Sequence, residues 1–258
     1  MKKLSNQLIL ALVAVLGLIS SLQAQTSENK NYLFIHEAWA FEKAPKIMEN
    51  QGHNAVTIHL LGHSLASTLL AEMTITACVD KVAAAVDEIS SYVVLVAHTL
   101  GDSTIMLVGE LSSNRFESII YVIAFMQRNR EPLLTLALSD KETQMFLNLS
   151  LEPGNHFSFF NQDGVISIFY YNINPKKVQE PVLKLNWQIN AFYVQPIATS
   201  DEKFRSVKRI NFKMLQERMV TPELQLRMIN SIPPETVMEL DTGHLPFLWK
   251  PERFVTTL

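Results

Sequence analysis

Short apolar segments alternate with helical patterns along most of the chain. The apolar segments are Tyr32–His36, Ala55–Ile58, Val93–Val96, Ser118–Ala124, Val207–Lys213 and Thr236–Leu240. Helical patterns follow them at Pro45–Gln51, 76–90, Leu100–Glu110, Pro222–Ser231 and Pro251–Leu258. Strands that are almost entirely apolar and are separated by helices are typical of a parallel sheet covered on both faces. With right-handed crossovers, the pattern predicts a doubly wound, mostly parallel α/β sheet.

Residues 126–197 interrupt this alternation. The segment combines a polar entry, a leucine-rich run, several prolines and two aromatic clusters, HFSFF at 156–160 and IFYY at 168–171. We expect an insertion that forms a cap over the carboxyl edge of the sheet. Its aromatic side chains either line an apolar pocket or form the small core of the cap itself.

The amino-terminal residues have the pattern of a secretory signal peptide. Lys2 and Lys3 precede an apolar run at Leu8–Ile19, and small residues follow up to Ala24. We predict a signal peptide at 1–24 cleaved near Ala24, a flexible segment at 25–31, a domain at 32–258, and a periplasmic or secreted protein. The run is shorter than the ~20 residues of a membrane span, so no stable span is expected after cleavage. An uncleaved anchor is the alternative.

Composition narrows the classes of function. The chain is 48% hydrophobic and 18% charged with a net charge of −3, which argues against a nucleic-acid partner. Its single cysteine, Cys78, excludes an internal disulfide and falls on the apolar face of a predicted helix, so a structural thiol is favoured over a catalytic one. Scattered histidines and the lack of a CxxC motif give no indication of a metal site.

The segment VVLVAHTLGD at 93–102 has the form of a nucleophile elbow. A buried strand leads into Thr99, and the small residues Ala97 and Gly101 stand two positions before and after it. In such a turn the next N–H, here that of Leu100, points to the same place as the nucleophile's hydroxyl. The loop after the first strand offers the Ala38 N–H as a second oxyanion donor.

An acid and a histidine follow later strands. Glu217 lies in MLQERMVTP after the 207–213 strand, and His244 lies in ELDTGHLPF after the 236–240 strand. The order nucleophile, acid, histidine is the one this architecture requires, and ligand sites of open α/β sheets lie at this edge. The alternatives are a solvated pair of Glu217 with Arg218 and a structural histidine.

Together these segments resemble the α/β-hydrolase superfamily, and among its members the small bacterial esterase-like proteins related to plant methyl esterases and hydroxynitrile lyases. The matching segments are HEAWAF (36–41), LLGHS (60–64), VVLVAHTLGD (93–102), ERMVTPELQLRM (217–228) and LDTGHLPFLWKPE (240–252). The resemblance implies ester hydrolysis without a cofactor, with Thr99 as nucleophile, His244 as base and Glu217 as acid. It also implies Ala38 and Leu100 as oxyanion donors.

The chain departs from the family's pattern around the chemistry. Thr99 stands where the family has serine, Glu217 where it has aspartate, and Asp102 and Glu37 where it has glycine. A β-branched residue is disfavoured at the positive φ of an elbow. A carboxylate ~4 Å from a developing oxyanion would cost about 4 kcal/mol at an effective dielectric of ~20.

Three functions are therefore open. The first is an exported hydrolase of a small carboxylic ester with an apolar group. The second is a catalytically inactive protein of the same fold that binds a small apolar ligand, which the four replacements favour. The third is a lyase, which would need a lysine near the pocket, and these motifs place none there.

Overall fold

The protein was analysed as a computed structural model that describes residues 29–36, 41, 43–61, 73–154, 156–173, 188–200 and 202–258. The predicted signal peptide at 1–24 lies outside these residues, so it stays a prediction. Within them, no helix is both long and apolar enough to cross a membrane.

Six parallel strands form the central sheet, in the order β2-β1-β3-β4-β8-β9. Their bounds are β1 Asn31–His36, β2 Asn54–His59, β3 Val93–His98, β4 Phe116–Val122, β8 Lys208–Met214 and β9 Thr236–Leu240. All six predicted strands are present. The order reverses between β1 and β3, so the chain winds in both directions from the centre, which confirms the predicted α/β fold.

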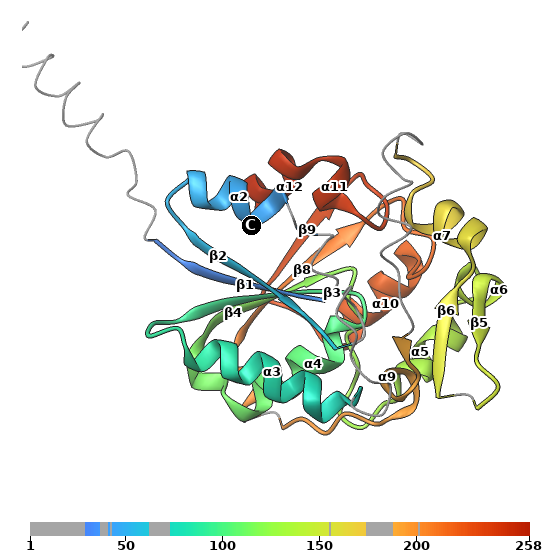
Figure 1. The fold of residues 1–258 in the computed structure, drawn as a ribbon, viewed down its shortest axis with the longest axis horizontal. Coiled ribbons are helices and arrows are strands. Elements are labelled where there is room, and N and C mark those ends of the chain that lie inside the picture. Colours follow the sequence, from blue (N-terminus) through green and yellow to red (C-terminus); the bar gives the residue numbers. More distant parts are fainter. Residues whose placement is uncertain are drawn as a thin grey trace, which may run out of the picture.

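Helices cover both faces of the sheet (Figure 1). One face carries α3 (Ile75–Asp87) and α4 (Gly101–Leu111), and the other carries α2 (Lys43–Asn50), α11 (Pro246–Trp249) and α12 (Pro251–Thr257). A further helix, α10 (Pro222–Ser231), packs beside β8. Because both faces are covered, the central strands can be apolar at every position.

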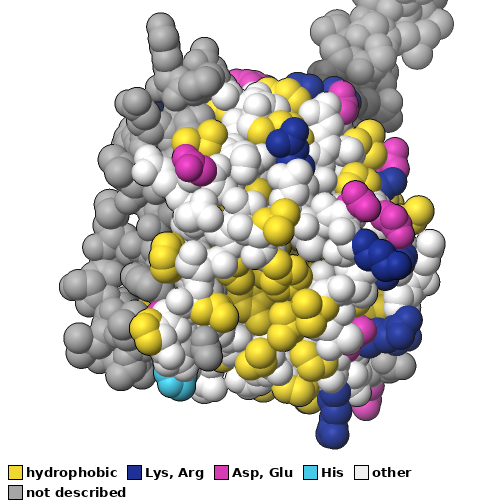
Figure 2. Space-filling model, turned by 90° about the vertical axis from the view of Figure 1, so that its right-hand side faces the viewer, with side chains coloured by type: hydrophobic (Ala, Val, Ile, Leu, Met, Phe, Trp, Pro, Cys, Tyr) yellow, Lys and Arg dark blue, Asp and Glu magenta, His cyan; other side chains and the backbone are white. Residues whose placement is uncertain are grey.

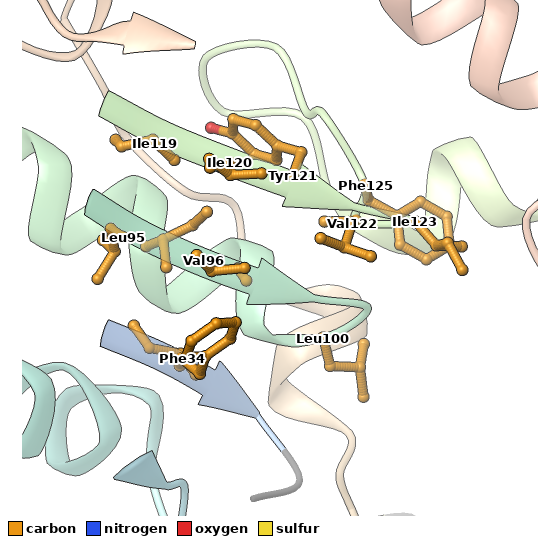
Figure 3. Packing of buried hydrophobic residues seen from close by; sticks show 14 of the residues in the cluster. Phe34, Leu95, Val96, Leu100, Ile119, Ile120, Tyr121, Val122, Ile123 and Phe125 are labelled. Carbon is orange, nitrogen blue, oxygen red and sulfur yellow. The ribbon is translucent and has the colours of Figure 1, made fainter. Parts of the chain in front are cut away.

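The core lies between the central strands and their helices. Leu95 and Val96 of β3 pack near Ile119 and Ile120 of β4 and near Phe34 of β1, and each is at most 1% exposed (Figure 3). All six residues of β3 are buried. A strand of this kind positions the turn at its end rigidly, because both of its neighbours are hydrogen-bonded to it.

Cys78 of α3 is a free thiol buried in this core. Burial raises the pKa of the thiol, so the reactive thiolate is disfavoured. The prediction of a structural cysteine is confirmed.

The predicted insertion is present between β4 and β8. Its described elements are α5 Leu133–Ser139, α6 Met145–Asn148, β5 Leu149–Leu151, β6 Phe157–Phe160, α7 Gln162–Phe169, β7 Gln188–Ile189 and α9 Ala191–Val194. The strands make a separate antiparallel sheet in the order β5-β6-β7, at one end of the main sheet (Figure 1). We refer to this unit as the cap.

The start of the cap is fastened to the loop that follows β8. The carboxylate of Asp140 accepts hydrogen bonds from the backbone N–H and the hydroxyl of Thr221, at 3.0 and 2.9 Å. The hydroxyl of Thr143 donates to the carbonyl of Met219 at 2.6 Å. These side chains are buried or half-buried, so the bonds are shielded from water and fix the cap to this loop.

Candidate active site

The turn after β3 has the backbone expected of a nucleophile elbow. Thr99 follows the last residue of β3 with φ +45°, and α4 begins at Gly101. Left-handed backbone is rare for residues with a Cβ and rarer for β-branched ones, and it costs of order 1–3 kcal/mol. Thr99 is also only 3% exposed. The fold therefore holds a strained, buried hydroxyl at the end of the central strand.

Leu100 lies at the amino-terminal end of α4, as the elbow requires. The first N–H groups of a helix have no carbonyl partner within the helix and carry partial positive charge. They are therefore suited to an anionic oxygen. Ala38 and Glu37 lie outside the described residues, so the second oxyanion donor and the effect of Glu37 remain predictions.

His244 and Glu217 form a buried pair. His244 Nδ1 lies 3.0 Å from Glu217 Oε1, and the two residues are 3% and 4% exposed. With Nδ1–H donating to the carboxylate, Nε2 is left as the acceptor that a general base needs. The N–H of Met219 donates to the same Oε1 at 2.7 Å and fixes the carboxylate. The pair has the geometry of the acid and histidine of a catalytic triad.

Arg218 does not pair with Glu217, so the solvated-pair alternative is wrong. Its guanidinium donates to the carbonyl of Ser167 at 2.9 Å and stacks 3.6 Å from the centre of the Tyr171 ring. Both partners belong to the cap side of the molecule. Arg218 therefore fastens the acid loop to the cap, while Glu217 turns inward to the histidine.

Gln225 of α10 braces the acid loop from the other side. Its Oε1 accepts from the N–H of Met214 at 2.8 Å, and its Nε2 donates to the carbonyls of Val220 and Met214 at 2.7 and 3.1 Å. Gln225 is 2% exposed and each of these bonds joins it to backbone. One side chain thus closes the loop that carries Glu217, a role that sequence analysis did not detect.

His98, immediately before Thr99, connects the elbow to the histidine loop. Its Nε2 lies 2.9 Å from the carbonyl oxygen of His244, and the two rings are 4.7 Å apart edge to face. Burial holds the pKa of His98 well below its ordinary value, so the ring is neutral and Nε2–H donates. Sequence analysis missed this residue. The only signal was a polar side chain at the end of an otherwise apolar strand.

The cap reaches the site through residues of both of its aromatic clusters. The ring of Phe169 packs on the ring of His244 at a centroid distance of 4.5 Å, and Phe160 packs edge to face on Phe169 at 5.0 Å. A Cβ on Gly243 would lie 3.0 Å from atoms of Tyr171, so this glycine permits the close approach of cap and histidine loop. These aromatic residues cover His244.

Asp102 lies where a negative charge is disfavoured. The side chain is completely buried in the first turn of α4, and its Oδ1 accepts the Ser103 N–H at 2.5 Å. Burial raises the pKa of Asp102 well above its ordinary value, although the hydrogen bonds from Ser103 oppose that shift. The protonated carboxyl is therefore favoured more strongly than in an exposed aspartate. This opposes the negative charge that the sequence suggested near the developing oxyanion.

The described part of the chain contains no set of side chains arranged to bind a metal ion. No group of three or more His, Cys, Asp or Glu side chains there is arranged to hold a metal ion. The side chains of His98, His244 and Glu217 do lie close together there, through the bonds from His98 to the His244 carbonyl and from His244 to Glu217.

Comparison with known proteins supports this assembly of elements. No protein-family profile matches the chain. Methylesterase 7 from Arabidopsis thaliana is 24% identical over 240 residues, which cover 86% of this chain and 91% of the relative. Methylesterase 1 from the same plant is 23% identical over 235 residues, covering 84% of this chain and 89% of the relative.

Solved structures agree in fold. A pyrethroid hydrolase from Sphingobium faniae superimposes with a TM-score of 0.79 at 15% identity, covering 89% of this chain and 96% of that chain. At such identity the likeness concerns the fold alone. Taken with the related methylesterase sequences, it shows that this chain has the α/β-hydrolase fold and is similar in sequence to the plant methylesterases.

Proposed function

We propose that this protein hydrolyses a small carboxylic ester through Thr99, His244 and Glu217. The observation that carries the proposal is the buried His244–Glu217 pair, 3.0 Å apart, in which the backbone of His244 is hydrogen-bonded to the last residue of the strand that leads into Thr99. The names of its relatives, methylesterases and a pyrethroid hydrolase, agree with an ester substrate.

The reaction proceeds in two steps. In the first, Thr99 Oγ1 attacks the ester carbonyl carbon as His244 Nε2 takes the hydroxyl proton, and the resulting imidazolium is stabilised by Glu217. The oxyanion lies against the Leu100 N–H, with the Ala38 N–H as the predicted second donor. Collapse breaks the bond to the alcohol oxygen, which takes the proton from His244. In the second step, water activated by His244 attacks the acyl-threonine and releases the acid.

The aromatic cover over the base favours an ester with an apolar group. Phe169 excludes water from one face of His244, and the exclusion of water strengthens the electrostatic interactions of the site.

We also propose that the mature protein starts near Gln25 outside the cytoplasm, on the basis of the charged and apolar pattern of residues 1–24. The amino-terminal sequence of the purified mature protein tests this.

A second candidate function is ligand binding without turnover. It is favoured by Thr99 itself, because a β-branched residue at φ +45° brings an extra methyl group into the space of substrate or base. The acid–histidine pair would then be retained without a competent nucleophile.

Hydrolysis of short-chain p-nitrophenyl esters separates the two. The assay compares wild type, Thr99→Ser, Thr99→Ala and His244→Ala. The histidine control is His53→Ala, because His53 immediately precedes β2, at the edge of the sheet opposite to the candidate site. We expect measurable turnover in wild type, faster turnover in Thr99→Ser, and losses in Thr99→Ala and His244→Ala. A silent wild type with an active Thr99→Ser protein would mean that the scaffold is intact and that one methyl group has switched off its chemistry, whereas a nearly inert Thr99→Ser protein and a stable ligand complex without turnover would support the binding function. Equal rates in wild type and Thr99→Ala would remove Thr99 from the mechanism.

A further inference from the structure

The cap contains a cavity of about 830 Å³. It lies between the small sheet, α6 and α9, and it reaches Met73 before α3. Apolar side chains from these elements dominate its described lining, among them Met145, Leu149, Leu151, Phe157, Ile189 and Val194. Its volume falls within the range of small-molecule sites, which is roughly 300–1,000 Å³.

The cavity is distinct from the candidate active site. Thr99, Glu217 and His244 are all described residues, and none of them is among the residues that line it. On β6, Phe157 lines the cavity, whereas Phe160 packs against Phe169 and so belongs to the cover of His244. The first aromatic cluster noted in the sequence, at 156–160, therefore contributes to both places, whereas Phe169 of the second covers His244.

Some of the lining is exposed. Leu151 and Val194 are 57% and 55% exposed although both are large and apolar. Figure 2 shows apolar side chains gathered around a hollow on the face of the molecule that the cap occupies in Figure 1. A concave apolar surface of this kind gains free energy when a ligand removes it from water, at roughly 25 cal/mol per Å².

The polar groups of the lining restrict the chemistry of a ligand. The described lining contains no Asp, Glu, Lys or Arg side chain, and its polar members are His156, Asn190 and Tyr193. The hydroxyl of Tyr193 already donates to Gln188 at 3.1 Å. Glu152 accepts the N–H of His156 at 2.7 Å and thus lies beside the cavity. Its carboxylate would repel an anionic group there.

We propose that this cavity is a binding site for a small, uncharged apolar molecule with at most one hydrogen-bonding group, which His156 and Asn190 would receive. A concave space bounded by several elements suits a single enclosed molecule better than the flat surface of a second protein. The site does not depend on the chemistry of Thr99, so it does not depend on the proposed ester hydrolysis.

Fluorescence titration with N-phenyl-1-naphthylamine, a neutral apolar probe, tests the proposal on the full mature protein. Leu151→Asp places a charge in the lining and should weaken binding at least tenfold. The matched control is Leu147→Asp, because Leu147 is 83% exposed on the same cap and does not belong to the lining. Ala191→Trp fills the cavity from α9 and should abolish binding without adding charge. His244→Ala should bind the probe like wild type.

Equal probe affinity in wild type, Leu151→Asp and Ala191→Trp would overturn the site. Loss of affinity in His244→Ala with normal affinity in the two cap variants would also overturn it, by placing the probe at the triad. Circular dichroism of each variant verifies folding. Since Ala191→Trp adds no charge and Leu151→Asp adds no volume, failure of one variant to fold leaves the other as a test.

Discussion

The imidazole of His98 and the backbone carbonyl of His244 are joined by a 2.9 Å hydrogen bond across 146 residues of sequence. His98 is the last residue of β3, and Thr99 is the next residue along the chain. The bond therefore fixes the loop of the base directly to the strand that carries the candidate nucleophile. His98 is a positioning residue: it acts on His244 through the backbone.

Replacement of His98 by phenylalanine should lower stability. The ring would still pack on Phe41 and Phe247, but the carbonyl of His244 would lose its donor in a buried place. We expect the free energy of unfolding to fall by about 1–3 kcal/mol. Urea unfolding measures it. His98→Gln, which retains an N–H donor, should recover part of the loss, and a phenylalanine variant as stable as wild type would contradict the bond's contribution.

Asp102 should make stability depend on pH. Burial raises its pKa in the folded protein, so above about pH 4 the folded state keeps a proton that the unfolded chain loses. The free energy of unfolding then decreases as pH rises, by at most about 1.4 kcal/mol per pH unit until the raised pKa is reached. Asp102→Asn has no such proton. The difference between wild type and this variant in urea unfolding should therefore change from pH 5 to pH 7, and parallel curves would show that Asp102 is ionised.

The positive φ of Thr99 should make the folded protein less stable than it would be with glycine at this position. Glycine adopts φ +45° without steric cost, so Thr99→Gly should raise the free energy of unfolding by about 1 kcal/mol. The matched control is Thr104→Gly, because Thr104 is equally buried but lies inside α4, where glycine is unfavourable. Thermal or urea unfolding of both variants decides this. Destabilisation of similar size at the two positions would mean that the turn carries no strain.

Gln225 should be essential to the stability of the loop that carries Glu217. Gln225→Leu would leave the Met214 N–H and two carbonyls without their partner in a buried place, at a cost of about 3 kcal/mol. Gln216→Leu is the control in the same region, because Gln216 is exposed and bonds only Asp241 through its side chain. A surface change of that kind should stay within about 0.5 kcal/mol. Equal losses of unfolding free energy in the two variants would contradict this role of Gln225.

Much of the fold follows from the pattern of apolar residues. The runs at 93–96 and 118–124 predict buried parallel strands because both faces of such strands are covered by helices. The end of β3 differs from the prediction: the strand continues through Ala97 and His98, since pairing with β4 holds them in register although neither is a strong strand former. The strands of the cap went unnoticed because they are only two to four residues long.

Part of the candidate site could also be predicted, because some of its residues lie in local sequence motifs. The elbow and the histidine loop are local motifs, so Thr99, Leu100 and His244 could be selected from neighbours in sequence. The roles of His98 and Gln225 depend on partners that the folded chain brings to them, and nothing in their own sequence surroundings indicates those partners. The pKa of Asp102 likewise depends on burial, which a single sequence does not determine.

The bonds from Asp140 and Thr143 to Thr221 and Met219 have a mechanical consequence for ligand exchange. Residues 140–143 and the loop that carries Glu217 must move together or not at all. If a ligand entered by lifting this side of the cap, Glu217 would be drawn away from His244 and the base would lose its orienting carboxylate whenever the protein opened. Entry through the opposite side of the cap would leave the pair of His244 and Glu217 intact.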